Sequence, residues 1–242
     1  SEKFGRGEDL DEFRPSGALE IRKAGQEFDK MRRRIIRHLN QRSEMLSGIS
    51  HDLRTPLTRI KLQLAMINDK NLSKKLSSDV DDMEKMLNEY LQFASTGAKD
   101  KTETFDISEL ILKLINNYSN PNIIQNFKEE IYFNGRKNLI ARCINNLIEN
   151  SLKYAKKVEI SMEKQKDNLM IMVSDDGPGV PEKEHENIIK PFYKIDKSRS
   201  ESKSSVGLGL SIASDISRSH GGDIKFAKSK FGGLEVSISL PF

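Results

Sequence analysis

The chain of 242 residues has little of what defines several protein classes. It contains one cysteine and no tryptophan, and no run of about 18 apolar residues occurs in it. A single cysteine excludes an internal disulfide framework and fits a reducing cytosol. The missing apolar run excludes a membrane-spanning helix from this sequence, and no signal peptide precedes residue 20.

Two further absences narrow the range of partners and nucleotide sites. The 40 Lys and Arg residues nearly balance 36 Asp and Glu residues, and the net charge of +4 is too small to indicate a nucleic-acid partner. A basic stretch between Lys30 and Arg42 is typical of a solvated helix face. The Gly-Lys-Ser/Thr ending of a P-loop is also missing from the sequence, which argues against that type of phosphate site.

The most informative segment is residues 50–57, with the sequence Ser-His-Asp-Leu-Arg-Thr-Pro-Leu. His51 lies two residues from the neighbouring positions of an apolar helical seam, so a turn of roughly 100° per residue directs it to solvent. An exposed imidazole beside Asp52 can act as a nucleophile. Thr55 lies one turn further along the same face. These residues alone are equally consistent with a surface histidine on a coiled coil.

The apolar residues around this segment predict a helical hairpin. One seam with spacings of three and four runs over residues 46–67, and a second runs over residues 76–90. Residues 68–72 interrupt the periodicity and predict a turn. Pro56 lacks a backbone N–H, so we expect the first helix to bend beside His51. Because each helix has one apolar stripe, two copies are expected to form a dimeric four-helix bundle.

The periodicity also extends upstream of the hairpin. A seam from Ile21 to Ile35 predicts a helix over residues 17–40, preceded by a connector over residues 1–16. The seam then continues at Leu39, Arg42 and Leu46, which introduces an extra four-residue step. Such a stutter locally unwinds a coiled coil. We therefore expect a join here between an input helix and the helix that carries the histidine.

The remainder of the chain predicts a different architecture. A linker over residues 95–104 is expected to lead into an α+β layer sandwich, because helices alternate with strands that follow one another closely. The predicted helices cover residues 107–118, 137–155, 182–189 and 208–219. The predicted strands cover residues 130–133, 158–162, 168–175, 223–228 and 234–240.

One face of the predicted 137–155 helix carries side chains suited to phosphate and Mg²⁺. Asn146 and Asn150 are four residues apart and Lys153 follows three residues later, so the three share a face. Two carboxamides and an ammonium group can hold a hydrated Mg²⁺ ion and polyphosphate oxygens. Polar helix faces are common, so an ordinary solvated face is the alternative interpretation of this pattern.

Two segments with paired glycines follow. Asp175 ends an apolar strand, and Gly177 and Gly179 after it would allow a ring or a backbone to approach closely, although a simple tight turn has the same composition. Gly207 and Gly209 open a helix whose unpaired N–H groups favour phosphate. The intervening residues 191–205 are rich in Ser, Lys and Arg, which is typical of a cationic cover over phosphate and of a disordered surface loop.

Taken together, these motifs resemble those of the sensor histidine kinases. Residues 50–57 are similar to the H box, and their amino-acid sequence most resembles that of the EnvZ osmosensor type. Residues 17–40 resemble the second helix of a HAMP signalling module. The N, G1, F and G2 boxes are matched, in order, by Asn146 and Asn150, by Asp175, Gly177 and Gly179, by Phe192, and by Gly207 and Gly209.

The resemblance implies a fold and a chemistry. The fold is a dimeric helical bundle followed by an ATP-binding α/β sandwich of the GHKL (Bergerat) type, and the chemistry is phosphotransfer from Mg-ATP. His51 would accept the phosphoryl group, Asp52 would orient or deprotonate it, and Thr55 would place water for phosphatase action.

The same resemblance assigns roles around the nucleotide. Asn150, with Asn146, would bind Mg²⁺, and Lys153 and Arg199 would meet phosphates. Tyr154 would pack on adenine, whose amino group Asp175 would accept. One departure is Ser205, where members of this family often have another glycine.

The resemblance also implies an organisation and partners. It divides the chain into a connector (1–16), a HAMP helix (17–40), a dimerisation and histidine phosphotransfer domain (41–96), a linker (97–104) and a catalytic ATP-binding domain (105–242). The partners would be a second copy and the receiver domain of a response regulator. A sensor and transmembrane region outside this sequence would hold the intact protein at the cytoplasmic face of the plasma membrane.

Two other classes share part of this pattern. A non-catalytic dimeric scaffold would bind ATP only to set its conformation, and the intact Asn150, Asp175, Gly207 and Gly209 argue against it. A GHKL ATPase of the chaperone or mismatch-repair kind would lack a histidine box, which is complete in this chain. The sequence therefore favours a protein-histidine kinase.

Overall fold

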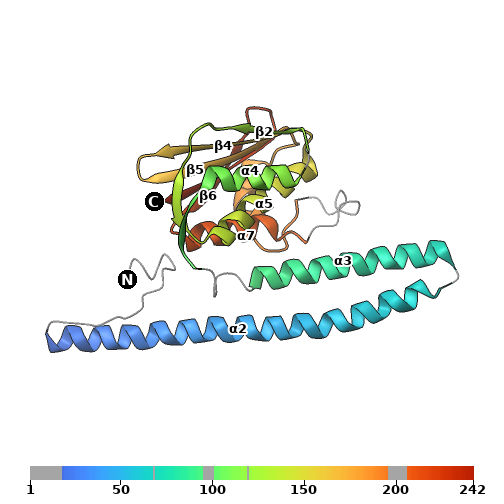
Figure 1. The fold of residues 1–242 in the computed structure, drawn as a ribbon, viewed down its shortest axis with the longest axis horizontal. Helices are drawn as coiled ribbons and strands as arrows, with labels where there is room; N and C mark the ends of the chain where they lie inside the picture. Colours follow the sequence, from blue (N-terminus) through green and yellow to red (C-terminus); the bar gives the residue numbers. More distant parts are fainter. Residues whose placement is uncertain (1–17, 68, 95–100, 119, 196–205) are drawn as a thin grey trace. The chain divides into compact units, whose positions relative to one another are not determined.

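A computed structural model of the chain describes residues 18–67, 69–94, 101–118, 120–195 and 206–242 (Figure 1). The chain divides into two compact units. Among the described residues, one unit covers 18–94 and the other covers 101–242. Each unit is considered by itself below.

The first unit is a helical hairpin, as the two seams predict. Helix α2 spans Leu19–Ala65 and helix α3 spans Lys70–Ala94. The Asp69 carboxylate accepts hydrogen bonds from the backbone N–H groups of Asn71 and Leu72 at 2.9 and 3.0 Å, and so caps the start of α3. Neither these helices nor the others in the described ranges have an apolar stretch long enough to cross a membrane.

The two helices contact each other through a narrow apolar strip and a few polar bridges. Leu64, Val80 and Leu91 are buried between them. Lys61 of α2 lies 2.7 Å from Asp81 of α3 and also pairs with Glu84. Helix α2 continues through Pro56 and curves towards its C-terminal end (Figure 1). The proline is therefore accommodated within one 47-residue helix.

The second unit contains a five-stranded mixed sheet in the order β2-β4-β5-β7-β6. Its strands are β2 (Ile123–Asn126), β4 (Val158–Gln165), β5 (Asn168–Asp175), β6 (Asp223–Lys228) and β7 (Leu234–Pro241). Strand β2 runs parallel to β4, and the other neighbours are antiparallel. Strands β1 (Glu103–Asp106) and β3 (Tyr132–Gly135) form a separate antiparallel pair.

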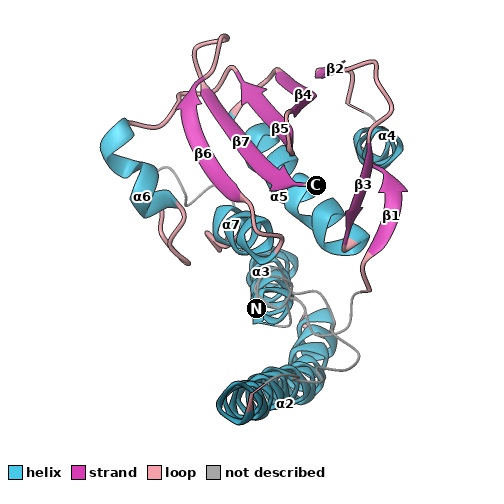
Figure 2. Cartoon of the chain, turned by 90° about the vertical axis from the view of Figure 1, so that its left-hand side faces the viewer, coloured by secondary structure: helices cyan, strands magenta, loops and turns pink. Residues whose placement is uncertain are grey.

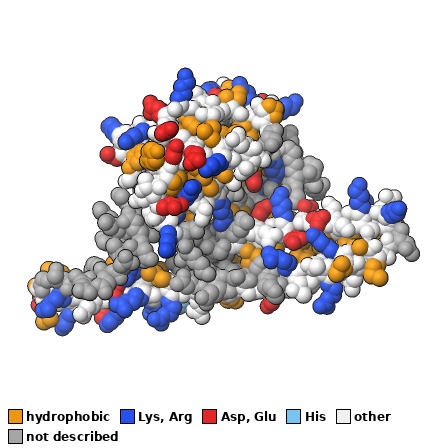
Figure 3. All heavy atoms as spheres, in the orientation of Figure 1, with side chains coloured by type: hydrophobic (Ala, Val, Ile, Leu, Met, Phe, Trp, Pro, Cys, Tyr) orange, Lys and Arg blue, Asp and Glu red, His pale blue; other side chains and the backbone are white. Residues whose placement is uncertain are grey.

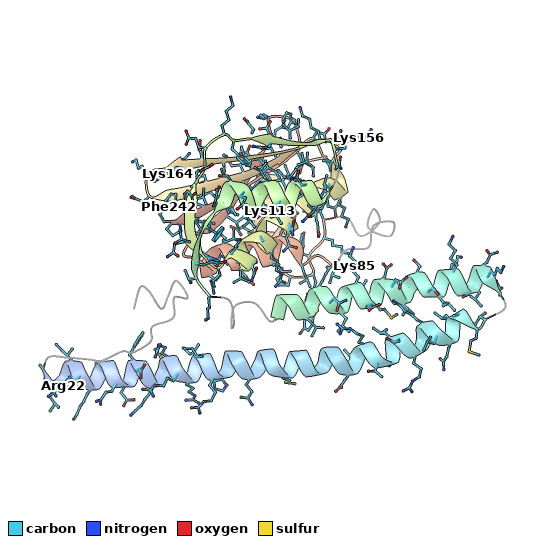
Figure 4. All side chains as sticks on the ribbon, viewed as in Figure 1. Arg22, Lys85, Lys113, Lys156, Lys164 and Phe242 are labelled. Carbon is cyan, nitrogen blue, oxygen red and sulfur yellow. The ribbon has the colours of Figure 1, made fainter. Side chains whose placement is uncertain are left out.

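Helices cover one face of this sheet (Figure 2). They are α4 (Ile107–Asn117), α5 (Lys137–Tyr154) and α7 (Gly209–Ser219). Alternate residues of β7 are buried, as are apolar residues of α5 such as Ile144 and Ile148, so sheet and helices enclose one core. At the end of the sheet where β4 and β7 finish, the Lys164 ammonium lies 4.7 Å from the centroid of the Phe242 ring. This end lies on the opposite side of the unit from Lys156 (Figure 4). This sandwich confirms the predicted fold class.

Four elements differ from the sequence-based prediction. Strand β1 begins at Glu103, inside the predicted linker, and β3 lies two residues beyond the predicted strand at 130–133. Strand β2 was not predicted, because three of its four residues are exposed and give no alternating pattern. The predicted 182–189 helix is a 3₁₀ turn, η1 (Glu182–Glu184), followed by one turn of α-helix, α6 (His185–Ile188).

Pairing between distant segments explains the position of β3. Phe105 of β1 stands opposite Phe133 of β3, and the two rings meet edge to face with centroids 6.3 Å apart. Both side chains are buried. The register of a short strand is thus set by a partner about thirty residues earlier, which local periodicity does not report.

Candidate functional site

The residues of the H box lie on α2. The backbone of His51 is part of the helix, and its side chain lies outside the described part of the structure. Asp52 and Thr55 are both exposed. Between them in sequence, Arg54 donates a hydrogen bond to Asn88 of α3 at 3.3 Å. Thus α2 presents an acid and a hydroxyl to solvent on either side of a residue that contacts the partner helix.

The predicted polar face of α5 is present. Asn146, Asn150 and Lys153 are half-buried on one side of the helix. Ile144, Leu147 and Ile148 are buried on the other side, and Leu152 is half-buried.

Asn146 joins this face to the start of α7. A Cβ atom at Gly209 would lie 3.7 Å from Asn146 Oδ1, so the second glycine of the G2 motif lies against this carboxamide. The Nδ2 atom of Asn146 is buried and has no hydrogen-bond partner among the described residues. A buried N–H donor in that state is costly, and an acceptor such as a phosphate oxygen would satisfy it.

The donor set around Asn146 and Asn150 fits a Mg²⁺ ion carried by a nucleotide. Carboxamide oxygens are hard ligands, and Mg²⁺ usually takes few protein ligands while keeping waters and phosphate oxygens. Within the described ranges, no cluster of three His, Cys, Asp or Glu side chains could hold a metal ion by itself. The chemistry therefore suits a metal that arrives with phosphate.

Asp175 at the end of β5 is the most firmly held polar side chain of the site. Its Oδ1 atom accepts hydrogen bonds from the backbone N–H groups of Gly177 at 2.9 Å and Leu234 at 3.0 Å. Its Oδ2 atom accepts one from the Ser151 hydroxyl at 3.0 Å. The side chain is 3% exposed. Three elements, α5, the turn after β5 and the start of β7, thereby fix the orientation of one carboxylate.

The turn after β5 lies close to the end of α5. A Cβ atom at Gly177 would lie 3.0 Å from Asp175 Oδ1 and 3.3 Å from the Tyr154 carbonyl oxygen, so a larger residue there would displace backbone. Gly179 has φ of 71°, a left-handed conformation that favours glycine. The Lys153 ammonium lies 5.0 Å from the centroid of the half-exposed Tyr154 ring.

Asp176 fastens the same turn to the connection between α5 and β4. Its Oδ1 atom accepts hydrogen bonds from the backbone N–H groups of Lys156 and Lys157 at 2.8 and 2.9 Å. These donors, first that of Lys157, lower the pKa of the Asp176 carboxyl below its ordinary value. The two neighbouring acids of this motif therefore have different roles, because Asp176 holds the turn against the start of β4 and Asp175 faces inward.

Phe192 and Gly207 bracket the segment predicted to cover phosphate. The Phe192 N–H donates to the Gly207 carbonyl at 3.0 Å, and both residues have positive φ, 65° and 82°. A Cβ atom at Gly207 would lie 3.0 Å from the Tyr193 carbonyl oxygen, so glycine is required there. Arg199 and Ser205 lie outside the described residues.

The structure thus brings the motifs of the α/β unit together in two groups. Asp175, Gly177 and Tyr154 adjoin at one end of α5, and Asn146 adjoins Gly209 two turns earlier. The sequence reasoning missed Ser151 and Gly233. A Cβ atom at Gly233 would collide with the Asp175 carboxylate and the Gly177 nitrogen. The Gly232-Gly233 pair before the last strand was a signal that could have pointed to this contact.

Family comparisons identify both units. Residues 41–99 match the His Kinase A (phospho-acceptor) domain, and residues 135–242 match the family described as histidine kinase-, DNA gyrase B- and HSP90-like ATPase. The first match includes His51, Asp52 and Thr55. The second includes Asn146, Asn150 and Asp175.

Individual relatives agree with these matches. The chain is 35% identical over 229 residues to the sensor histidine kinase GtrS of Pseudomonas aeruginosa, which covers 93% of this chain and 47% of GtrS. It is 30% identical over 240 residues to the sensor histidine kinase CpxA of Escherichia coli, which covers 93% of this chain and 52% of CpxA. The chain therefore spans about half the length of the curated relatives it matches.

A solved structure supports the fold independently. Full-length ShkA in complex with AMPPNP superposes with a TM-score of 0.66 over 83% of this chain and 46% of ShkA, at 21% sequence identity. At that identity the likeness concerns the fold alone. In this chain a phospho-acceptor domain precedes an ATPase domain of the histidine kinase type. Its relatives, which align over 93% of the chain, are sensor histidine kinases. The chain therefore belongs to the sensor histidine kinase family.

Proposed function

We propose that this chain is a kinase core that phosphorylates its own His51 from Mg-ATP. It then passes the phosphoryl group to an aspartate on the receiver domain of a response regulator. The observation that carries the proposal is the buried Asp175 carboxylate, held by three donors beside the Asn146 and Asn150 face of α5. This arrangement suits adenine at one end of α5 and phosphates further along the helix.

The roles within the nucleotide site follow from side-chain chemistry. Asp175 accepts the adenine amino group, Tyr154 packs on the base, and Gly177 and Gly179 leave room for it. Asn150 with Asn146 holds Mg²⁺, which offsets charge on the phosphate oxygens when bound. Lys153 and Arg199 meet phosphates, Gly207 and Gly209 allow the backbone to approach them, and Phe192 borders the site.

The phosphoryl transfer requires a nucleophile and a proton acceptor. A ring nitrogen of His51 attacks the γ-phosphorus, the new P–N bond forms, and the bond to the bridging oxygen breaks so that ADP leaves with that electron pair. The other ring nitrogen gives up its proton to Asp52. In the second transfer the P–N bond breaks as an aspartate oxygen of the receiver domain attacks the same phosphorus.

Dephosphorylation of the regulator is a separate proposed activity. Thr55 lies one helical turn beyond His51 and its side chain is exposed on α2. A hydroxyl at that position can orient a water molecule for attack on the phosphorylated aspartate of a docked receiver domain. The proposal makes the chain bifunctional, with different residues of one helical face serving the two reactions.

The proposed domain organisation keeps residues 1–16 as a connector, 17–40 as a HAMP helix, 41–96 as the dimerisation and phosphotransfer domain, 97–104 as a linker and 105–242 as the catalytic domain. The functional form is a homodimer. By analogy with the longer sensor relatives, the intact protein would act at the cytoplasmic face of the plasma membrane through a sensor and transmembrane region outside this chain.

Incubation with γ-labelled ATP tests the central proposal. We expect acid-labile label on the chain, none on a His51→Ala variant, and strongly reduced label on Asp175→Asn, because an amide is no longer purely an acceptor towards adenine. ATP binding without label would instead support a scaffold, and release of phosphate without label would support a GHKL ATPase.

A further inference from the structure

Asp175 has few acceptor positions left for a ligand. An ionised carboxylate offers about four lone-pair positions, two on each oxygen. The N–H groups of Gly177 and Leu234 occupy those of Oδ1, and the Ser151 hydroxyl occupies one on Oδ2. One position on Oδ2 remains. The carboxylate is fixed as well as occupied, because its three donors belong to different elements of the fold.

Ser151 determines which position remains. It follows Asn150 on α5, is 1% exposed, and donates to Asp175 Oδ2 at 3.0 Å. We propose that Ser151 is a positioning residue that makes this site select a purine with an exocyclic amino group at C6 over a 6-oxo purine. The inference rests on the proposed nucleotide-binding function and goes beyond it by assigning base selectivity to a residue outside the family motifs noted above.

The selectivity follows from counting donors and acceptors. A 6-amino group donates to the single remaining lone pair of Oδ2. A 6-oxo purine presents an acceptor at that atom, which repels the Oδ2 lone pair, and its N1–H lies at the neighbouring ring position. With Oδ1 held by Gly177 and Leu234, and Oδ2 held by Ser151, the carboxylate cannot turn to accept that N1–H instead.

Two other buried serines of the unit donate to backbone carbonyl groups. Ser217 is fully buried, and its hydroxyl donates to the Asp223 backbone carbonyl at 3.1 Å. Ser211 donates to the Leu208 carbonyl of its own chain segment at 2.8 Å. Ser151 donates instead to a carboxylate, and hydrogen bonds to a charged acceptor are stronger and more directional than neutral ones. Ser217 therefore provides a matched control for the loss of a buried hydroxyl.

The test compares nucleotide affinities of the whole chain. Calorimetric titration with Mg-ATP, Mg-ITP and Mg-GTP would be made on the wild type and on Ser151→Ala, Ser217→Ala and Asp175→Asn. For Ser151→Ala we expect ATP affinity to fall about fivefold to tenfold and the ATP-to-ITP affinity ratio to fall by about the same factor. Ser217→Ala should keep both the ATP affinity and the ratio.

A conservative variant separates positioning from packing. Ser151→Thr retains the hydroxyl, so a folded Ser151→Thr protein should keep the wild-type ratio even if the added methyl group lowers its melting temperature. The proposal is overturned if Ser151→Ala keeps the wild-type ratio, or if folded Ser151→Thr loses it. Failure of the wild type to bind Mg-ATP, or unchanged binding in Asp175→Asn, would instead overturn the proposed function itself.

Discussion

The helical hairpin and the α/β unit bury their apolar side chains to different extents. In the α/β unit, Ile144 of α5 and Ile171 and Ile238 of the sheet have no exposed surface. In the hairpin, seam residues Leu53 and Ile60 remain 44% and 40% exposed, and apolar side chains are visible on its surface (Figure 3). A sheet covered by helices completes a core within one chain, whereas two helices leave apolar stripes that a second copy can cover.

Polar side chains of the proposed sites are likewise more buried in the α/β unit than in the hairpin. Asp175 is buried and fixed by three donors, while Asp52 and Thr55 on α2 are exposed. A site that binds one small molecule gains from being formed in advance. The face around His51 has to meet, in the proposed mechanism, both a nucleotide and a receiver domain, and an open surface permits that exchange of partners.

Removal of the histidine should give the largest effect. His51→Ala is expected to lower autophosphorylation by at least about 1,000-fold, because the attacking atom is lost, while ATP affinity changes less than about twofold. Labelling and calorimetry on one preparation measure both quantities. His38→Ala, at an exposed position of the same helix, is the matched control. Equal loss of ATP binding would contradict the division of labour between the two units.

Thr55→Ala should produce the next largest effect, and on one activity only. We expect dephosphorylation of the phosphorylated regulator to fall about tenfold to 1,000-fold, since a positioned contact to water is lost, with a much smaller change in autophosphorylation. Thr58→Ala is the control, because the Thr58 hydroxyl donates to the Arg54 carbonyl of α2. A parallel decline of both activities and of melting temperature would make Thr55 a structural residue.

The same substitution in the two regions should have different consequences. Ile144→Ala leaves a cavity in a closed core and should lower the free energy of unfolding of the α/β unit by about 2–5 kcal/mol. Ile60→Ala should leave that unit unchanged and weaken the dimer about tenfold, because a second copy in the proposed bundle would cover the 40% of Ile60 that is exposed in one chain. Calorimetry and sedimentation measure these changes, and a stable monomer at micromolar concentration would refute the bundle.

The last prediction concerns the dependence of stability on pH. Burial lowers the pKa of His220 to about 4, and its Nε2 atom accepts a hydrogen bond from the Arg136 backbone N–H at 3.2 Å. Between pH 6.5 and 4 this histidine is protonated in the unfolded chain, where its pKa is about 6.5, but stays neutral in the folded chain. The free energy of unfolding should therefore decrease by up to about 3 kcal/mol as the pH falls from 6.5 to 4.

Denaturation of the wild type and of His220→Gln at several pH values checks this expectation. The variant should lose most of the slope between pH 6.5 and 4. His185→Gln is the control for replacement of a histidine elsewhere in the unit, since the His185 ring lies against the Phe226 ring and not against Arg136. A wild-type slope in His220→Gln would mean that other groups cause the acid sensitivity.

Much of the fold was predictable because its signals are local. The seams of the hairpin, the buried positions of α5 and the alternation of β7 all follow from side-chain periodicity. The short strands β1 and β2 were not predictable in this way, since each has four residues and depends on pairing with a distant segment. The single turn of α6 was overestimated as a longer helix, and the left-handed Phe192 follows shortly after it.

The sequence alone determined the order and chemistry of the motifs, because the residue types that bind phosphate, accept an amino group or attack phosphorus can be read without coordinates. Only the tertiary structure decided which hydrogen-bond donors fix the side chains of these motifs. Ser151 is twenty-four residues from Asp175, and Leu234 is fifty-nine residues from it, yet both donate to its carboxylate. Such contacts arise where α5, β5 and β7 pack together, and no local pattern in the chain encodes them.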